Sequence, residues 1–309
     1  MRIASLLPSA TEIVCALGLE DQLVAVTHEC DFPIRVKRKP VVTASAVSPN
    51  TGSGAIDRHI RRLVHEGSSI YHLDADLLAA LDPNLILTQE LCQVCAVSYP
   101  IVESAARRLG GSTQLVSLEP ESLSDVYDHV QLVGRLTDRI DEADRVVTGL
   151  QERVSAVNRL VGQREPRRVL CLEWIDPLFG SGHWTPELVE LAGGQDLLGS
   201  RRRPARVITW EEVLAAAPDV LVVMACGFSL DRSLQEMPLL EQRPGWEALP
   251  AVRSGDVYVV DGNAYFSRPG PRLVDSVEIM AGLLHPDLVT RAAPDVARRW
   301  AGSSAGQPP

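Results

Sequence analysis

The feature that most constrains this chain is a proline-free stretch, residues 122–163, in which apolar residues recur at helical spacing. The repeat begins at Val126 and continues through Val133 to Leu160. It predicts one long amphipathic helix, either continuous or broken once near Gly134–Asp138. At 1.5 Å of rise per residue, a continuous helix would be about 60 Å long, which is more than the width of one ordinary domain core. We therefore expect the helix to serve two bodies.

Strands alternate with helices on both sides of this stretch. Upstream, the alternation starts with a strand at 3–7 and ends with one at 113–118, and downstream it restarts at 168–174. A coiled-coil arm is the alternative, but no return helix follows the stretch. The pattern favours an α/β protein with two Rossmann-like lobes, each with a central sheet, joined by a single long backbone helix. The predicted division is an N-terminal lobe at 1–121, the connecting helix at 122–165, a C-terminal lobe at 166–286 and a flexible tail at 287–309.

Composition limits the classes of function. A chain of 309 residues, of which 45% are hydrophobic, can bury the cores of two domains. The net charge of -10 argues against nucleic acid as a partner, because the phosphate backbone demands a basic face. No apolar run approaches the roughly 20 residues that a membrane-spanning helix needs. We therefore expect a protein that is not embedded in a membrane and binds no nucleic acid.

The N-terminus favours a cytoplasmic location. Met1 and Arg2 lead directly into the first apolar strand, which leaves no room for the charged segment, apolar core and cleavage site of a secretory signal. In a reducing compartment, the six cysteines are expected to be thiols or metal ligands rather than disulfides.

Three helix starts carry capping signals. The segments Ser9-Ala-Thr-Glu12 and Thr209-Trp-Glu-Glu212 match the capping box, in which a hydroxyl caps the helix and a glutamate reaches back from its third position. Thr185 precedes a proline, which is the order typical of an N-cap followed by proline in the first helical position.

Polar and aromatic groups follow the predicted strands of both lobes. In open α/β sheets, ligands bind outside the carboxyl ends of the strands, so these segments supply candidate ligand contacts. His183 could reach a ligand from its glycine-flanked loop or could bond to backbone. Trp174 and Trp184 could stack on a flat macrocycle or could seal the lobe cores. The candidates are Ser9, Thr11, His28, Glu29, Glu90, Trp174, His183, Trp184, Tyr265, Phe266 and Arg268.

Four cysteines also lie at predicted strand ends. Cys92 and Cys95 form a C-x-x-C pair, which places two sulfurs within reach of one ion. His28, Cys30 or His183 would complete the tetrahedral set that zinc prefers, or a thiolate cage for an iron-sulfur cluster, and such ligands would also suit copper. The alternative is that these cysteines are small apolar fillers. The candidate metal ligands are Cys30, Cys92, Cys95, His183 and Cys226.

Four segments carry a resemblance to a known family: LLPSATE, ALDPNLILT, LFGSGHWTPELVELAGG and NAYFSRPGPR. In this order around the long helix, they resemble the cobalamin and iron-siderophore class of periplasmic-type substrate-binding proteins, and most of all its vitamin B12 binding branch. The resemblance extends from Arg2 to about Leu284. It implies a receptor without enzymatic activity that holds its ligand between two rather rigid lobes and, in transport members, docks on a membrane permease. It also implies that the loop of Tyr265, Phe266 and Arg268 lines the ligand pocket.

These observations lead to two hypotheses of different class. The first is a non-enzymatic protein that holds cobalamin, or a related corrinoid or metal chelate, in the cleft between its lobes, with an ABC permease as partner if it is exported. The second is a metalloprotein that binds zinc, iron or an iron-sulfur cluster through Cys30, Cys92, Cys95 and histidine. Catalysis is disfavoured, because the chain has no P-loop and no dinucleotide fingerprint after its first strand.

Overall fold

The computed structural model describes residues 1–47, 51–65, 70–89, 99–108, 113–290 and 292–302. The chain divides into two compact units. The first comprises Met1–Thr51, Ala55–Pro120 and Ser124–Gly149, and the second Gly52–Gly54, Glu121–Leu123 and Leu150–Pro309. The main boundary therefore falls inside a helix, between Gly149 and Leu150.

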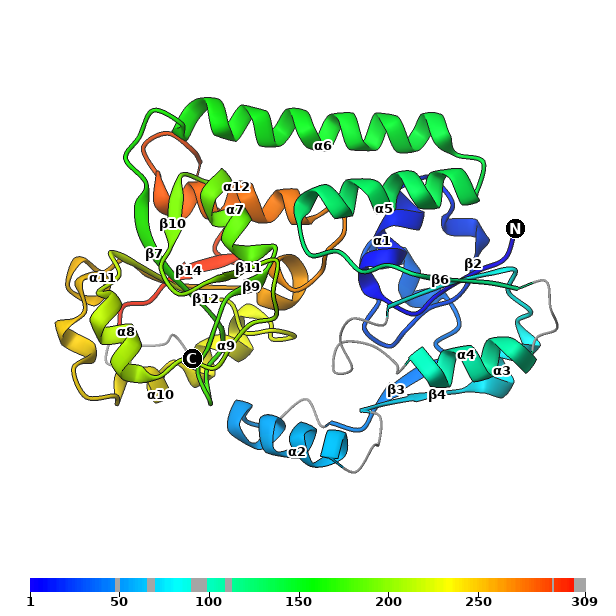
Figure 1. The fold of residues 1–309 in the computed structure, drawn as a ribbon, viewed down its shortest axis with the longest axis horizontal. Helices are drawn as coiled ribbons and strands as arrows, with labels where there is room; N and C mark the ends of the chain where they lie inside the picture. Colours follow the sequence, from blue (N-terminus) through cyan, green and yellow to red (C-terminus); the bar gives the residue numbers. More distant parts are fainter. Residues whose placement is uncertain (48–50, 66–69, 90–98, 109–112, 291, 303–309) are drawn as a thin grey trace. The chain divides into compact units, whose positions relative to one another are not determined.

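The first unit is built on a parallel sheet whose strand order is β2-β1-β5-β6 (Figure 1). Because side chains alternate across a strand, the central strands β1 and β5 contribute to two cores. Ile3 and Leu87 pack on one face with the first helix, α1, whereas Ala4 and Ile86 pack on the other with α3 and α4. The four strands are β1 (Ile3–Ser5), β2 (Leu23–Ala25), β5 (Leu85–Thr88) and β6 (Gln114–Ser117).

The other elements before the connector include a small antiparallel pair, β3 with β4. The strand β4 places Tyr71 opposite Ser45. The elements are α1 (Pro8–Ala16), η1 (Glu20–Gln22), η2 (Ile34–Arg38), β3 (Thr43–Ser45), α2 (Ser53–His65), β4 (Tyr71–Leu73), α3 (Ala75–Ala80) and α4 (Tyr99–Arg108).

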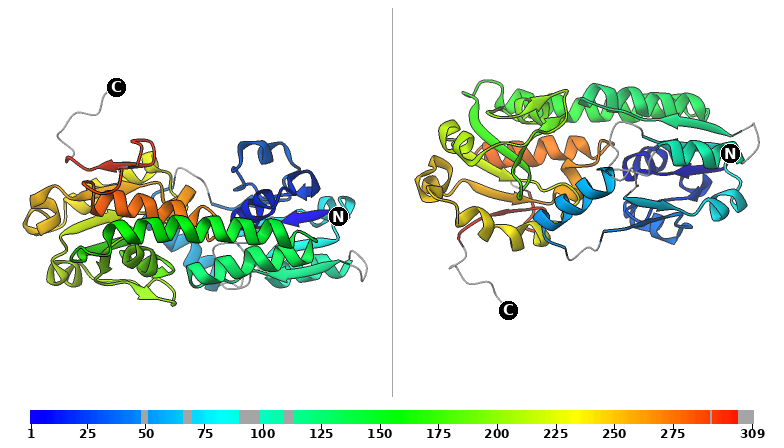
Figure 2. Two further views of the ribbon diagram at one scale, coloured as in Figure 1. Left: turned by 90° about the horizontal axis from the view of Figure 1, so that it is seen from above. Right: turned by 60° about the horizontal axis from the view of Figure 1, so that its bottom comes forward.

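The long amphipathic stretch forms two helices, α5 (Leu123–Leu136) and α6 (Ile140–Val161), so a single continuous helix is the wrong alternative. The chain turns at Asp138, which has a left-handed φ of 56°. Gly134 permits the turn, because a Cβ there would lie 2.5 Å from the Cβ of Ala143. The two helices lie side by side in Figures 1 and 2. The longer helix α6 passes from the first unit to the second, and its 22 residues span about 33 Å.

The second unit has a six-stranded sheet with the order β10-β7-β12-β13-β14, and β8 pairs with β7. The first four strands are parallel, whereas β14 and β8 run antiparallel to their neighbours. A separate short pair, β9 with β11, lies beyond the end of β7. The strands are β7 (Arg167–Trp174), β8 (Phe179–Gly180), β9 (Gly182–His183), β10 (Gly194–Asp196), β11 (Ser200–Arg201), β12 (Val220–Val223), β13 (Val257–Val260) and β14 (Ala297–Arg299).

Helices α7 and α12 pack against each other in this unit. The loop after β13 is a single turn of π-helix. The helices are α7 (Thr185–Leu191), α8 (Trp210–Ala216), α9 (Leu230–Glu236), α10 (Pro238–Glu241), η3 (Trp246–Ala248), α11 (Pro250–Ser254), η4 (Gly262–Phe266) and α12 (Leu273–Leu284).

The expectation of a flexible tail from residue 287 is wrong for the segment that forms β14. Ala297 pairs with Val260, and Arg299 pairs with Tyr258, so this segment completes the edge of the sheet. The side chain of Trp300 donates a hydrogen bond to Glu241 Oε1 at 2.7 Å. The sequence pattern does not predict β14, because a strand of three residues is too short to show an alternation of apolar and polar side chains.

One of the three capping signals is confirmed. Thr209 and Glu212 form the reciprocal capping box at the start of α8. Ser9 is not a cap, because α1 already begins at Pro8 with Leu7 as its N-cap. Thr185 is also inside its helix, and its hydroxyl donates to Glu173 Oε1 at 2.8 Å instead of capping. Within the described ranges, no helix is both long and apolar enough to span a membrane.

Candidate ligand-binding site

The end of β1 in the first unit leads to a buried group of hydroxyls and one thiol. Thr11 Oγ1 donates to Ser5 Oγ at 2.8 Å and lies 3.1 Å from Cys30 Sγ. Thr27 Oγ1 lies 3.2 Å from the same sulfur. Cys30 is only 4% exposed and belongs to the hydrophobic core. Ser9 is also buried, and it directly precedes Ala10 of the same core. The position of Cys30 therefore agrees with its alternative interpretation, a small core filler.

The end of β2 presents polar groups at the surface of the first unit. The backbone N–H of His28 donates to Thr43 Oγ1 at 3.1 Å, and the ring Nδ1 lies 2.7 Å from the same oxygen. The hydroxyl of Tyr71 donates to Glu29 Oε1 at 3.3 Å, and the rings of Tyr71 and His28 lie 5.6 Å apart. The antiparallel pair β3-β4 thus supports an exposed imidazole and a half-buried carboxylate. Tyr71 and Thr43 were not predicted, because their strands leave no clear periodicity.

The loop from Ser181 to Thr185 in the second unit, called the histidine loop below, brings two predicted candidates together. The rings of His183 and Trp184 stack with centroids 5.5 Å apart. Trp184 Nε1–H donates to the carbonyl oxygen of Phe266 at 2.9 Å, which ties the loop to the segment after β13. The backbone N–H of His183 donates to Arg203 O at 2.7 Å, and its carbonyl oxygen accepts from the backbone N–H of Arg202 at 2.9 Å.

The backbone and imidazole of His183 are both unusual. Its φ of 49° lies in the left-handed region, which costs a non-glycine residue energy and persists only where the surroundings enforce it. Its ring Nδ1 is buried and has no hydrogen-bond partner among the described residues. Burial lowers the pKa of His183, although Glu121 opposes the shift. The structure therefore presents a neutral imidazole with an unused ring nitrogen at physiological pH.

Two half-buried carboxylates hold the histidine loop, and no sequence pattern pointed to either of them. Glu173 Oε1 accepts from the backbone N–H of Gly182 at 2.9 Å and from the Thr185 hydroxyl at 2.8 Å. Asp196 Oδ2 accepts a short hydrogen bond from Ser181 Oγ. Burial raises the pKa of Glu173 to about 7 and that of Asp196 to about 6. The available signal was a glutamate that directly follows the apolar run at residues 169–172 of β7.

Trp174, at the end of β7, belongs to a cluster of aromatic and cationic groups. Its ring lies 5.0 Å from the ring of Phe228, and the guanidinium of Arg232 lies 4.6 Å from the centroid of that ring. Trp174 Nε1–H donates to Asp176 O at 3.0 Å, and the tryptophan remains half-buried. Phe228 is itself buried, so it supports Trp174 from the interior, and neither Phe228 nor Arg232 was among the predicted contacts.

The loop after β13, which the family resemblance assigns to the ligand pocket, holds two of its three predicted contacts inside the second unit. Phe266 is 2% exposed and Arg268 is 4% exposed, so both belong to the interior of the second unit. The pattern was misleading because burial of these side chains depends on α12 and on the histidine loop, which are distant in sequence. Tyr265 is half-buried, and the guanidinium of Arg272 lies 5.6 Å from the centroid of its ring.

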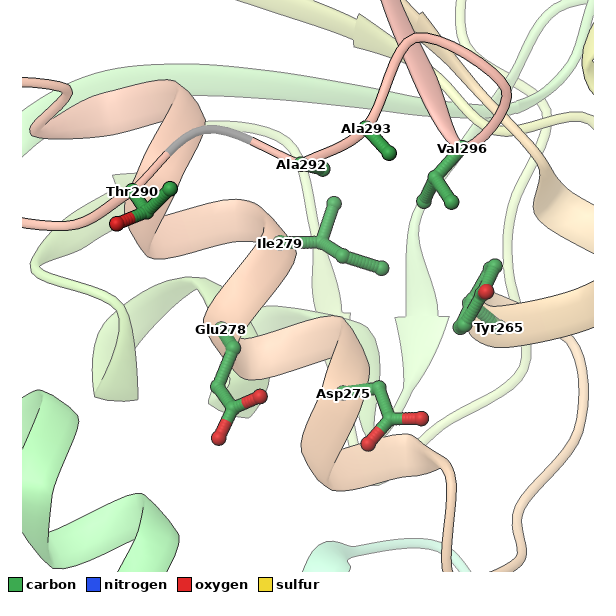
Figure 3. Close-up of a pocket in the computed structure, with 8 residues that line it drawn as sticks. All are labelled: Tyr265, Asp275, Glu278, Ile279, Thr290, Ala292, Ala293 and Val296. Carbon is green, nitrogen blue, oxygen red and sulfur yellow. The ribbon is translucent and has the colours of Figure 1, made fainter.

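Tyr265 lines a pocket of about 300 Å³ beside α12 (Figure 3). Asp275 and Glu278, on the same helix, already share one cation: Arg153 lies 2.5 Å from Asp275 and 2.7 Å from Glu278. The remaining lining is mainly apolar, with Ile279 in its middle. The lining residues are Tyr265, Asp275, Glu278, Ile279, Thr290, Ala292, Ala293 and Val296.

The thiol hypothesis meets little support in the described part of the chain. Glu90, Cys92 and Cys95 lie outside the described residues. Cys226 is exposed. Across the described ranges, no three histidine, cysteine, aspartate or glutamate side chains are grouped to hold a metal ion.

The fold and its strand-end sites define a class: two α/β units with parallel sheets and a helix that runs from one into the other, which confirms the predicted fold class. A family model described as "Periplasmic binding protein" matches residues 3–264. The chain belongs to this family of solute-binding proteins and is not an enzyme.

Three relatives illustrate the similarity. An uncharacterized ABC transporter substrate-binding lipoprotein, YvrC, from Bacillus subtilis is 24% identical over 93% of this chain and 80% of its own length. The vitamin B12-binding protein of Vibrio cholerae is 22% identical over 90% of this chain and 86% of its own. The periplasmic heme-binding protein RhuT from Roseiflexus sp. RS-1, in apo form, superposes with a TM-score of 0.70 at 21% identity, covering 92% of this chain and 98% of that one.

Proposed function

We propose that this protein binds cobalamin, or a closely related corrinoid, as the ligand-binding component of an ABC transporter. The observation that carries the proposal is the histidine loop: a neutral imidazole with an unused Nδ1, stacked on a tryptophan at a strand end. Neutral imidazole is a common ligand of metal centres, and an aromatic face suits a flat macrocycle. The name of the Vibrio cholerae relative supports the same ligand class.

The proposal assigns particular contacts to each unit. In the second unit, His183 and Trp184 contact the macrocycle or its substituents, and the half-buried Trp174, supported by Phe228, adds aromatic surface. In the first unit, the exposed imidazole of His28 and the carboxylate of Glu29 offer hydrogen bonds to amide side chains. The strand ends are fixed by hydrogen bonds before any ligand arrives, so affinity comes largely from preorganisation.

Heme is the second ligand to consider, because RhuT carries that name and shares the fold. An imidazole would serve either macrocycle, whereas the large amide-bearing rim of a corrinoid demands more hydrogen-bond groups than heme with its two carboxylates. The polar residues His28 and Glu29 therefore favour the corrinoid.

The test is a pair of titrations, with cyanocobalamin and with hemin, on the wild-type protein and on His183→Asn. Asparagine tolerates the left-handed backbone of position 183, so this variant removes the imidazole without disturbing the loop. We expect cyanocobalamin to bind more tightly than hemin, and the variant to lose about tenfold in affinity, or about 1.4 kcal/mol.

The matched control is His72→Ala, which removes an exposed imidazole from β4. It should bind cyanocobalamin as the wild type does. Unchanged cyanocobalamin affinity in His183→Asn would contradict the role of His183, and tighter binding of hemin would contradict the choice of ligand.

A further inference from the structure

We propose that Glu173 and Asp196 are positioning residues that hold the histidine loop in the conformation that presents His183 and Trp184 to the ligand. The inference rests on the proposed function, and it adds two residues to which neither the sequence patterns nor the relatives point. They lie on neighbouring parallel strands, where Asp196 of β10 pairs with Val169 of β7.

The two carboxylates secure the loop on both sides of His183. Asp196 binds the side chain of Ser181, at the start of the loop. Glu173 binds Gly182 N–H and the Thr185 hydroxyl through a single oxygen, at 2.9 and 2.8 Å, and so closes the loop around the histidine. A residue in left-handed backbone needs its neighbours fixed in this way, because nothing in its own preferences keeps it there.

The packing around these bonds leaves no room for rearrangement. A Cβ at Gly182 would lie 2.2 Å from the backbone nitrogen of Ala205. A Cβ at Gly199 would lie 2.7 Å from both Asp196 Oδ2 and Ser181 Oγ. The two glycines therefore allow backbone and carboxylate to approach as closely as the hydrogen bonds demand.

Even partial removal of two acidic groups from water is costly, so their presence calls for a role that apolar residues could not fill. Removal from water raises the pKa of both carboxyls, which records that cost. Apolar side chains of similar size would pack the same space, but they would leave Gly182 N–H and two hydroxyls without acceptors. The carboxylates are thus explained by what they hold, which is the histidine loop.

The experiment compares Glu173→Ala with Glu173→Gln and measures two quantities. The first is hydrogen exchange at the amides of the histidine loop in ligand-free protein, and the second is affinity for cyanocobalamin. Glutamine keeps an oxygen that accepts both hydrogen bonds, so it should retain loop protection and affinity within about twofold. Alanine should speed exchange at residues 182–185 by about tenfold and weaken affinity by a similar factor.

The structural control is Val222→Ala, which opens a cavity in the neighbouring strand β12 without touching the loop. It should lower stability yet leave loop exchange and affinity unchanged. If Glu173→Ala fails to fold, Thr185→Val decides instead, because it removes one donor to Glu173 while keeping the side-chain shape. Exchange as slow as in the wild type, in whichever of these two variants folds, overturns the proposal.

The two measurements separate failure of this inference from failure of the proposed function. If wild-type protein does not bind cyanocobalamin, the proposed function is wrong, but loop exchange in Glu173→Ala and Glu173→Gln still tests the anchoring. If wild-type protein binds and the alanine variant keeps both its loop protection and its affinity, the positioning role is wrong and the ligand stands.

Discussion

At the scale of single residues, Glu173 couples the stability of the second unit to pH. Its folded-state pKa of about 7 lies above the ordinary value of 4.5 because the carboxyl is buried. Between these two values, native protein binds more protons at this site than unfolded protein does, so the contribution of Glu173 to stability falls as the pH rises. Below this window the carboxyl is protonated in both states, and above it the carboxyl is ionised in both.

This coupling predicts that the difference in the free energy of unfolding between Glu173→Gln and the wild type grows as the pH rises. Glutamine mimics the protonated acid at every pH, so the variant should match the wild type near pH 4.5 and gain on it as the pH rises to 7. The expected gain is about 3 kcal/mol, at about 1.4 kcal/mol for each unit of pKa shift. Urea unfolding at a series of pH values measures it. A difference that does not change with pH would show that Glu173 has an ordinary pKa.

Single-residue roles were predicted well only where they depend on local sequence. The capping box of Thr209 and Glu212 is a contact between residues three apart, and it is present. The matching pattern at Ser9 is wrong, because Pro8 already occupies the first helical turn. Burial of Phe266 and Arg268 depends on segments far along the chain, and no local pattern reports that. The roles of the predicted site residues in ligand binding stay predictions.

At the scale of elements, the connector shows what periodicity can and cannot establish. The apolar repeat correctly predicts helix over most of 122–163, and the chain breaks at Asp138, within the predicted span. The repeat could not show that α5 folds back beside α6, because both helices present similar apolar faces. Strand β14 and the pairing of β3 with β4 were not predicted, since three-residue strands carry too short a pattern to read.

Replacement of glycine by alanine should change the free energy of unfolding in opposite directions at two positions of the connector helices. Gly149 lies within α6 at the boundary of the two units, and a Cβ there would meet nothing within 4 Å. Gly149→Ala should therefore raise the free energy of unfolding by about 0.5–1 kcal/mol, because glycine is a poor helix former. Gly134→Ala should lower it by about 1–3 kcal/mol, because its Cβ would clash with Ala143.

Urea unfolding of both variants checks these values. The two substitutions add the same methyl group to connected helices, so each serves as the control for the other. A destabilising Gly149→Ala would mean that α6 needs its glycine for a reason other than packing, such as bending at the unit boundary.

At the scale of the whole molecule, the sequence was sufficient for the fold class and the family, because the order of strands, helices and motifs extends over most of the chain. It was insufficient for the anchoring carboxylates, which act on a loop through contacts between different strands. The cytoplasmic location stays a prediction, which fractionation of cells that make the full-length protein tests. The thiol hypothesis for Cys92 and Cys95 concerns residues outside the described ranges, and metal analysis of purified protein tests it.

The most direct test of the central claim is equilibrium dialysis of the purified wild-type protein against cyanocobalamin, with elemental analysis of the same preparation. We expect saturable binding of the corrinoid and no stoichiometric zinc, iron or copper in the protein before cyanocobalamin is added. A protein that carries stoichiometric metal and takes up no cyanocobalamin would contradict the proposed function, and would show that this binding-protein fold serves a thiolate metal site.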